Sequence, residues 1–233
     1  MRRRLIAGVT GVVCLLAGCG GATSHQSSHP VSTATVTAPA ATTLATATTP
    51  EPKPKPKPNP GSLPQTDQLP SAGTAQFHAE MAALWSGVTR NSLQAALPAF
   101  FPEGAYVQIK GIADPQADYT DRLLGAYKLD LGAAHGLLGA QPQTAQLVGV
   151  QVPQSYAHWV ASGACYNTVG YYEVPNARVV YRQNGAVRSF GIASMISWRG
   201  VWYVVHLGSV LPPNGVVDDP SGGAGQSAPS STC

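Results

Sequence analysis

The last third of the chain places the strongest limit on the fold, because residues 177–207 largely alternate apolar and polar side chains with a period of two. That period is typical of β-strands whose two faces meet different surroundings. Asn184-Gly185 is a strong signal for a two-residue hairpin turn, and Arg199-Gly200 is a weaker one. The pattern therefore predicts an antiparallel meander of three strands, residues 177–182, 186–198 and 201–207.

Counting outward from the two turns predicts which residues face each other across this meander. Phe190 is expected opposite Val179, and Ser194 is expected opposite Val205. This register makes one face apolar enough to form a core, and it leaves His206 pointing away from that core. A β-bulge would shift the count and exchange the two faces beyond it.

The second face of the meander mixes polar and apolar side chains, among them Arg178, Met195 and Trp202. Aromatic residues, methionine and arginine are enriched in protein interfaces. We therefore expect these three residues either to dock a partner, including a second copy of the chain, or to lie on a solvated sheet surface.

Residues upstream of the meander show a helical period. Residues 74–90 place apolar side chains three and four positions apart, Ser92 can cap a second helix that ends near Leu97, and residues 118–139 predict the longest helix. Residues 105–110 are predicted to form a strand, since Val107 and Ile109 alternate with polar or tyrosine side chains. Further strands are expected at residues 146–152 and within residues 160–172.

Helices followed by a curved antiparallel sheet predict an α+β fold. The order of elements from Phe77 to Leu207 resembles the cone-shaped, cystatin-like fold of the nuclear-transport-factor-two and SnoaL polyketide-cyclase superfamily. This resemblance implies a cavity between helices and sheet, where enzymes of the superfamily hold an acidic or histidine general base. The segments LWSGVTRNSLQAALPAFFPEGAYVQIK and SFGIASMISWRGVWYVVHLG are also similar to a family of actinobacterial lipoproteins that has no established activity.

The start of the chain has the layout of a secretory signal peptide, with arginine at positions 2–4 and an apolar run over residues 5–17. That run is shorter than the roughly 20 apolar residues that span a bilayer. Leu15-Leu16-Ala17-Gly18-Cys19 resembles the lipobox of bacterial lipoproteins, which implies transfer of diacylglycerol to the Cys19 thiol and cleavage before it. We expect residues 1–18 to be removed and Cys19 to anchor the protein to the outer face of the cytoplasmic membrane. The alternative is an ordinary signal peptide in which Cys19 has no role.

Residues 19–72 are rich in Ser, Thr, Ala and Pro and are expected to form a disordered tether ahead of a folded domain at residues 73–217. Its proline-rich centre, residues 50–58, favours a semi-rigid stalk that could carry O-linked sugars, or else a passive linker. Residues 218–233 are expected to be a flexible tail. Cys165 and the terminal Cys233 predict a disulfide in an exported chain; the alternatives are free thiols or a bond to another molecule.

The charge balance argues against nucleic acid as a partner. Without the arginines of the signal peptide, eleven of the 14 basic residues remain, equal to the 11 acidic ones. A neutral chain has no electrostatic footprint for the phosphate backbone. The sequence also lacks phosphate-binding, zinc-binding and nucleophile-elbow motifs, so it predicts no metal and no cofactor.

The expected cavity suggests a binding role more than a catalytic one. The candidate ligand-binding residues are Tyr106, Tyr127, Tyr181, Ser194 and Tyr203. None of these is a carboxylate or a histidine, whereas general acid–base catalysis needs a group that titrates near ambient pH. The sequence therefore favours a non-enzymatic module that binds an apolar small molecule or docks another cell-envelope protein.

The alternative is an isomerase-type or cyclase-type enzyme that acts on an apolar substrate. Asp130 and His135, on the long helix, are then the candidate general bases, although they lie on opposite shoulders of its apolar stripe and cannot pair with each other. An open apolar cavity that holds a buried carboxylate or histidine would reverse this preference. A filled interior would instead leave protein docking.

Overall fold

The computed structural model describes residues 59–208 and 214–226. The predicted signal peptide, Cys19, most of the predicted tether and Cys233 lie outside these residues, so the expectations about them stay predictions. Within the described ranges, no helix is long and apolar enough to cross a membrane. All of these residues belong to one unit of the chain.

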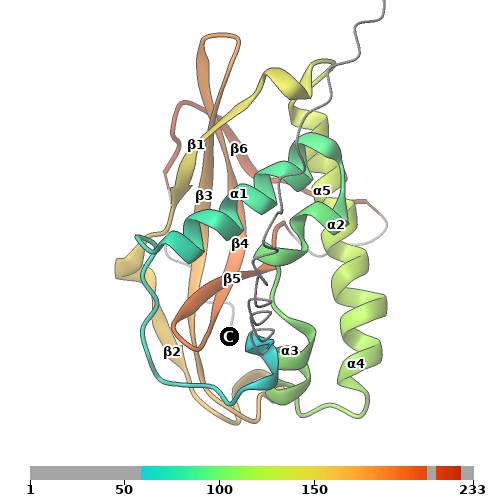
Figure 1. Ribbon diagram of the computed structural model, residues 1–233, viewed down its shortest axis with the longest axis vertical. Helices are drawn as coiled ribbons and strands as arrows, with labels where there is room; N and C mark the ends of the chain where they lie inside the picture. The colour runs from blue at the N-terminus through green and yellow to red at the C-terminus, as the bar shows by residue number, and fades with distance from the viewer. Residues whose placement is uncertain (1–58, 209–213, 227–233) are drawn as a thin grey trace, which may run out of the picture. The chain divides into compact units, whose positions relative to one another are not determined.

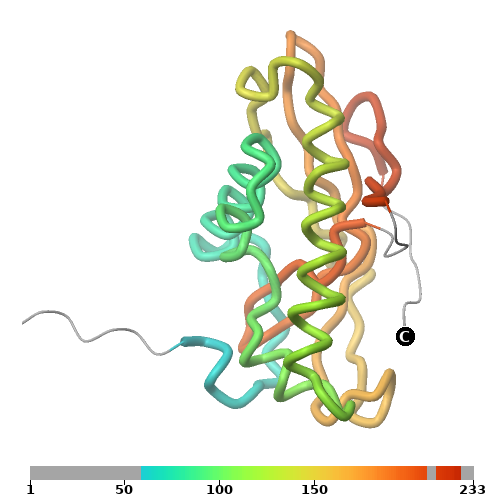
Figure 2. Tube along the Cα trace, turned by 90° about the vertical axis from the view of Figure 1, so that its right-hand side faces the viewer, coloured from blue at the N-terminus to red at the C-terminus, as the bar shows by residue number. Residues whose placement is uncertain are grey.

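The helices precede most of the sheet in the chain, and α1 crosses the face of the strands while α5 runs beside it (Figure 1). In Figure 2, α1 and α2 lie to one side of the strands. The helical elements are η1 (Pro60–Ser62), α1 (Ala75–Arg90), α2 (Leu93–Ala96), η2 (Leu97–Ala99), α3 (Glu103–Ile109), α4 (Pro115–Ala117), the π-helical turn η3 (Asp118–Leu123), α5 (Leu124–Leu137), η4 (Pro142–Thr144), η5 (Gln154–Tyr156) and η6 (Ala164–Tyr166).

The sheet has six strands, and all of its pairings are antiparallel. Four strands run in the order β1-β3-β4-β5, while β2 pairs with β3 and β6 pairs with β4. The strands are β1 (Gln146–Gln151), β2 (His158–Val160), β3 (Tyr171–Gln183), β4 (Ala186–Trp198), β5 (Val201–His206) and β6 (Asp218–Gly222). Helices combined with an antiparallel sheet confirm the α+β class.

Both predicted hairpin turns are present. Asn184 and Gly185 have φ of 51° and 77°, and Arg199 and Gly200 have φ of 52° and 75°. Positive φ at both central positions is the geometry that joins antiparallel strands through two residues. Phe190 pairs with Val179, as the count from the turns predicts.

The register at the end of β5 differs from the prediction. Ser194 pairs with His206 instead of Val205, because the register shifts between Ser194 and Met195. The extra residue lies on β5, and a bulge of this kind re-aims the side chains beyond it. As a result both Val205 and His206 line the interior cavity described below, and the prediction that His206 points away from the interior is wrong.

Helix α1 forms as its sequence predicts. Thr74 precedes it, and the Thr74 hydroxyl oxygen accepts a hydrogen bond from the Phe77 N–H at 3.1 Å. Ser92 caps α2 in the same way, by accepting the Ala95 N–H at 3.3 Å. The five predicted apolar positions of α1 are all buried: Phe77, Met81, Leu84, Trp85 and Val88.

The predicted strand at residues 105–110 is wrong, since these residues belong largely to helix α3. Tyr106 and Ile109, three positions apart, are buried, whereas Val107 is 41% exposed. So short a run fits either period, and periodicity alone does not decide it. Glu103 in the first turn favours the helix, because a negative charge stabilises the positive end of the helix dipole.

The long helical segment begins earlier than predicted. Asp114 caps it by accepting the Ala117 N–H at 2.9 Å, and the π-helical turn η3 connects α4 to α5. Along α5 the predicted apolar stripe faces the interior. Tyr127, Leu131, Ala134 and Leu138, which follows the last residue of α5, are buried, and Leu124 is half-buried.

The folded domain is longer than residues 73–217 at both ends. Near the start, the Pro60 carbonyl accepts the Trp198 indole N–H at 2.8 Å, and the Gln65 amide donates to the Ser197 carbonyl at 2.8 Å. Near the end, β6 lies within the predicted flexible tail and pairs with β4. Residues 59–72 and 218–222 therefore belong to the domain.

The candidate interface residues are not exposed. Met195 and Trp202 are 0% exposed, and Arg178 is 2% exposed. One Arg178 guanidinium nitrogen lies 2.7 Å from the Asp219 carboxylate, and the other donates to the Ser189 hydroxyl at 2.9 Å. The prediction of an accessible docking face at these positions is wrong, since both faces of the meander are buried there.

Candidate functional site

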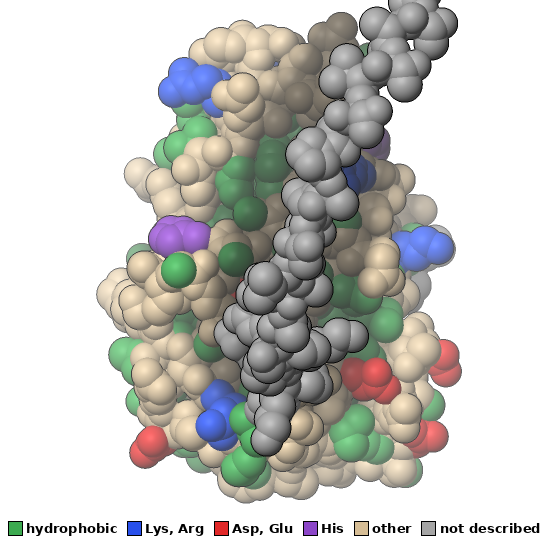
Figure 3. All heavy atoms as spheres, in the orientation of Figure 1, with side chains coloured by type: hydrophobic (Ala, Val, Ile, Leu, Met, Phe, Trp, Pro, Cys, Tyr) green, Lys and Arg blue, Asp and Glu red, His purple; other side chains and the backbone are tan. Residues whose placement is uncertain are grey.

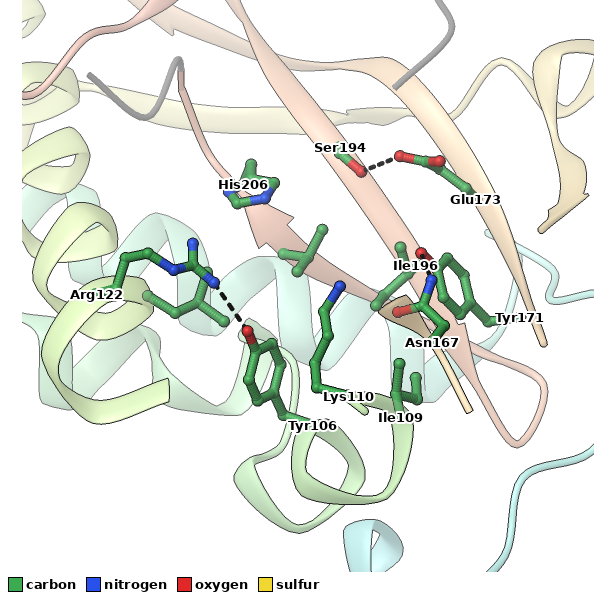
Figure 4. Close-up of a pocket in the computed structure, with 12 residues that line it drawn as sticks. Tyr106, Ile109, Lys110, Arg122, Asn167, Tyr171, Glu173, Ser194, Ile196 and His206 are labelled. Carbon is green, nitrogen blue, oxygen red and sulfur yellow. Dashed lines mark hydrogen bonds between the residues drawn. The ribbon is translucent and has the colours of Figure 1, made fainter. Parts of the chain in front are cut away.

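A cavity of about 320 Å³ lies between α3, η3 and the inner side of strands β3, β4 and β5 (Figure 4). We call it the inner cavity. Part of its wall is aliphatic, and the rest carries charged, amide, hydroxyl and imidazole groups. The lining residues are Tyr106, Ile109, Lys110, Arg122, Leu123, Asn167, Tyr171, Glu173, Ser194, Ile196, Val205 and His206.

A cluster of three polar side chains at the cavity connects α3 to η3. The Arg122 guanidinium donates to both carboxylate oxygens of Asp118, at 2.6 Å each, and to the Tyr106 hydroxyl at 2.8 Å. Tyr106 in turn donates to Asp118. Hydrogen bonding from Arg122 lowers the pKa of Asp118 to about 2. The third guanidinium nitrogen of Arg122, Nη1, makes no side-chain hydrogen bond to a described residue.

A second cluster of polar side chains lies across the cavity, on β3 and β4. The Ser194 hydroxyl donates to Oε1 of Glu173 at 2.7 Å, and Glu173 is 3% exposed. The other oxygen of Glu173 lies 3.7 Å from Nε2 of His158. Glu173 is therefore a buried carboxylate with polar neighbours on both of its oxygens.

The loop before β3 supplies a buried amide. Nδ2 of Asn167 donates to the Tyr171 hydroxyl at 2.9 Å, and Asn167 is 3% exposed. Oδ1 of the same side chain is buried and accepts no hydrogen bond within the described ranges. A buried acceptor needs a donor, so this atom suits a water molecule or an N–H or O–H group of an occupant.

Lys110 and His206 complete the polar wall. The Lys110 ammonium donates to the Cys165 carbonyl at 3.2 Å, and burial, followed by the positive charge of Arg122, lowers its pKa. Burial, with smaller contributions from Arg122 and Lys110, lowers the pKa of His206 to about 4. The imidazole is therefore neutral near pH 7 and offers one donor and one acceptor nitrogen. Neither nitrogen makes a side-chain hydrogen bond in the part of the chain that the structure describes.

The structure brings two of the five predicted ligand-binding residues, Tyr106 and Ser194, to the inner cavity. The other three are packed elsewhere in the core. Tyr127 stacks on Phe100 with ring centroids 4.1 Å apart, and Tyr181 stacks on Trp85 at 5.3 Å. Tyr203 packs edge-on against Phe101 at 6.0 Å.

Asp130 and His135 do not line the inner cavity. Asp130 is 3% exposed and accepts the N–H groups of Gly208 at 3.1 Å and Val216 at 2.9 Å. Nδ1 of His135 lies 2.8 Å from the Val88 carbonyl oxygen. The structure thus gives both residues positioning contacts at the edges of α5 and places neither beside the cavity.

The prediction that the cavity holds neither a carboxylate nor a histidine is wrong, since Glu173 and His206 both line it. Sequence reasoning also missed Lys110, Arg122 and Asn167. One signal was available for Glu173, because a charged residue between apolar strand residues is seldom buried without a specific role. For His206 the decisive feature is the bulge on β5, which the alternating pattern does not reveal.

Of the two cysteines in the predicted disulfide, Cys165 is described by the structure and Cys233 is not. Cys165 lies in η6 and is not a free thiol. Every other cysteine lies outside the described residues, so its pairing with Cys233 stays a prediction.

The surface and the comparisons add little to this geometry. On the face drawn in Figure 3, acidic and basic side chains are scattered and form no single basic stripe. Within the described ranges, no group of three or more His, Cys, Asp or Glu side chains could hold a metal ion.

Models of protein families, curated proteins and solved structures give no match to this chain. The chemistry of the site therefore rests on the inner cavity itself.

Proposed function

We propose that the chain is a cell-envelope lipoprotein whose domain, a cystatin-like cone, binds a small amphipathic molecule in the inner cavity without transforming it. The observation that carries the proposal is a cavity of about 320 Å³ with an aliphatic wall facing a polar one. The aliphatic wall consists of Ile109, Leu123, Ile196 and Val205. An occupant with one apolar end and one polar end fits both walls.

Packing energetics support this proposal. Protein interiors are packed to near-crystalline density and contain few voids larger than a water molecule. Water takes about 30 Å³ in the liquid, so the cavity has room for roughly ten groups of that size. It also falls in the size range typical of small-molecule sites. An occupant that covers the aliphatic wall and pairs with the polar wall would therefore stabilise the folded protein.

The predicted anchor supports the location. The lipobox-like segment at residues 15–19 and the proline-rich residues 50–58 would hold the domain near the outer face of the membrane. An amphipathic molecule released from the membrane or the envelope would then be within reach of the cavity.

Native mass spectrometry of the protein purified from membranes tests the proposal. We expect a small molecule to accompany the wild type and to be lost from Val205→Phe, which fills the cavity. Val148→Phe is the matched control, because Val148 on β1 is 59% exposed. A wild-type protein that carries no small molecule and takes none from a lipid extract of its membrane contradicts the proposal.

An enzyme of the isomerase or cyclase type is the second candidate, and the observation in its favour is the buried Glu173 carboxylate at the open cavity. Glu173, in place of Asp130 or His135, would accept a proton from the substrate. This candidate ranks second because the Ser194 hydroxyl already binds one oxygen of Glu173, and because His206, with a pKa of about 4, is a weak base near pH 7. Glu173→Gln separates the candidates when the isomeric form of the ligand is followed by chromatography or NMR, because isomerisation leaves its mass unchanged. An enzyme would keep its ligand and stop converting it, whereas a binding protein returns the same isomer with either residue.

A further inference from the structure

Hydrogen-bond donors from three separate segments face the inner cavity with unused capacity (Figure 4). Lys110, at the end of α3, uses one of its three N–H groups on the Cys165 carbonyl. Arg122, on η3, leaves Nη1 without a side-chain hydrogen bond to a described residue. The two ring nitrogens of His206, on β5, likewise make no side-chain hydrogen bond to a described residue.

We propose that these three side chains bind the carboxylate of a linear aliphatic acid, whose hydrocarbon chain lies against the aliphatic wall of the inner cavity. The inference rests on the proposed function and names the ligand class of that site. Ammonium and guanidinium groups form the strongest hydrogen bonds with carboxylates, and a guanidinium nitrogen adds direction. The inner cavity presents both kinds of group on its polar side.

The charges around the cavity set the ligand's protonation on binding. Two acidic side chains, Asp118 and Glu173, lie near the two basic ones, Lys110 and Arg122. A bound carboxylate therefore adds one uncompensated negative charge, and the neutral imidazole of His206 is the group that can take up a proton to balance it. Tyr106 and Tyr171 keep their protons, since burial raises the pKa of each.

Proton uptake gives the site a distinctive pH dependence. The pKa of His206 is about 4 in the empty protein and is raised by a neighbouring carboxylate. Affinity for the ionised acid should consequently increase as the pH falls from 7 toward 5. His158, which lies 3.7 Å from Glu173 outside the cavity wall, is the other histidine close enough to affect this profile.

Size selects the kind of acid. The cavity holds roughly ten water-sized groups, which corresponds to a chain of about eight carbons with its carboxylate. A phosphate monoester would bring a second negative charge that His206 alone cannot balance. A two-chain phospholipid exceeds the volume of about 320 Å³.

Calorimetry with octanoate tests the inference, using the full chain with Cys19→Ser so that no acyl chain is attached, stripped of bound ligand by fatty-acid-free albumin. Octanoate should bind with one site per chain, 1-octanol at least about tenfold more weakly, and inorganic phosphate not at all. If octanol binds as well as octanoate, the anion site is overturned while the proposed function stands. If octanoate does not bind, the inference is overturned, and the proposed function is then decided by the native mass of the membrane-purified protein.

Variants assign the effect to the polar wall. Lys110→Gln should weaken octanoate about tenfold or more and leave octanol unchanged. Lys110→Arg keeps the charge and should restore most of the affinity, which separates loss of the cation from misfolding. Lys128→Gln is the matched control, because Lys128 is an exposed residue of α5. Equal octanoate binding by Lys110→Gln and Lys128→Gln overturns the inference.

His206→Asn tests the coupled proton. Repeating the titration in buffers of different ionisation enthalpy measures the protons taken up with octanoate. The wild type should take up a proton near pH 6, and His206→Asn should take up close to none. Unchanged proton uptake in His206→Asn overturns the role of this side chain.

Discussion

The inner side of the sheet has two regions that differ in how completely they are filled. Beneath α1, the packed region consists of interlocking side chains such as Leu84, Val88 and the stacked pair Trp85 and Tyr181. Beneath α3 and η3, the open region is the inner cavity, with polar groups on its wall. Regular elements meet in the packed region, whereas the open region borders a π-helical turn and a β-bulge. Irregular backbone thus accompanies the space that a ligand could use.

The largest expected effect is on the stability of the packed region. Leu84→Ala should lower the free energy of unfolding by about 3 kcal/mol, because Leu84 is 1% exposed and its removal leaves a void among rigid neighbours. Leu123→Ala, at the border of the inner cavity, should cost about 2 kcal/mol although Leu123 is also 1% exposed, since the space left by its side chain would join the inner cavity and admit water. Urea denaturation measures both, and a larger loss for Leu123→Ala would contradict the comparison.

The two regions should respond to pH with opposite signs. In the packed region, burial raises the pKa of Glu80 to about 7. The folded protein then keeps a proton that the unfolded chain loses above about pH 4.5, so this residue lowers stability as the pH rises from 4.5 to 7. In the open region, the unfolded chain binds a proton at His206 below about pH 6.5 and the folded protein only near pH 4. His206 therefore lowers stability as the pH falls through that window.

Single variants separate these two contributions. Glu80→Gln should raise the free energy of unfolding at pH 8 by about 2–3 kcal/mol relative to wild type, and leave it nearly unchanged at pH 4.5. His206→Asn should instead raise the free energy of unfolding at pH 4.5, by about 1–2 kcal/mol, and leave it nearly unchanged at pH 8. This effect is smaller because the imidazole is partly exposed. Urea denaturation from pH 4.5 to 8 checks both signs, and parallel pH profiles for the two variants would refute the assignment.

Asp130 connects the end of the open region to α5. Its carboxylate accepts the N–H groups of Gly208 and Val216, and Gly208 follows His206 by two positions. Asp130→Asn should cost about 1–2 kcal/mol of unfolding free energy, because each carboxylate oxygen accepts one of these N–H groups and asparagine keeps a single acceptor oxygen, so its NH2 group would face the other N–H. It should also shift the NMR signals of the His206 ring, since the end of β5 would move. Asp121→Asn, an exposed change of the same kind, is expected to stay within about 0.5 kcal/mol and to leave those signals in place.

The packed region was predictable from local patterns, and the open region was not. Thr74 and Ser92 act as the caps that their sequences indicate, and Asn184-Gly185 forms the predicted turn. Each of these signals acts within a few residues and needs no tertiary context. The bulge on β5, by contrast, depends on one extra residue that leaves the alternating pattern intact.

The residues that line the inner cavity could not be predicted from the sequence for a related reason. The sequence pattern places Lys110 in a strand, because the period of so short a run is ambiguous. Glu173 lies on the part of β3 that precedes the predicted strand, and its neighbours at the cavity come from α3, η3 and β5. Contacts between such distant segments follow from tertiary packing, which periodicity does not encode.

The smallest expected effect tests the space itself, through the same substitution in each region. Val88→Leu adds a methylene where the side chain is 0% exposed and tightly enclosed, and it should cost about 1–2 kcal/mol. Val205→Leu adds the same group at the wall of the inner cavity and should change the free energy of unfolding by less than about 0.5 kcal/mol, because the methylene can enter empty volume. The same variant should weaken octanoate binding, since it shortens the space for the hydrocarbon chain. Equal costs for the two substitutions would mean that the cavity closes in solution, and both the packing contrast and the ligand site would then be lost together.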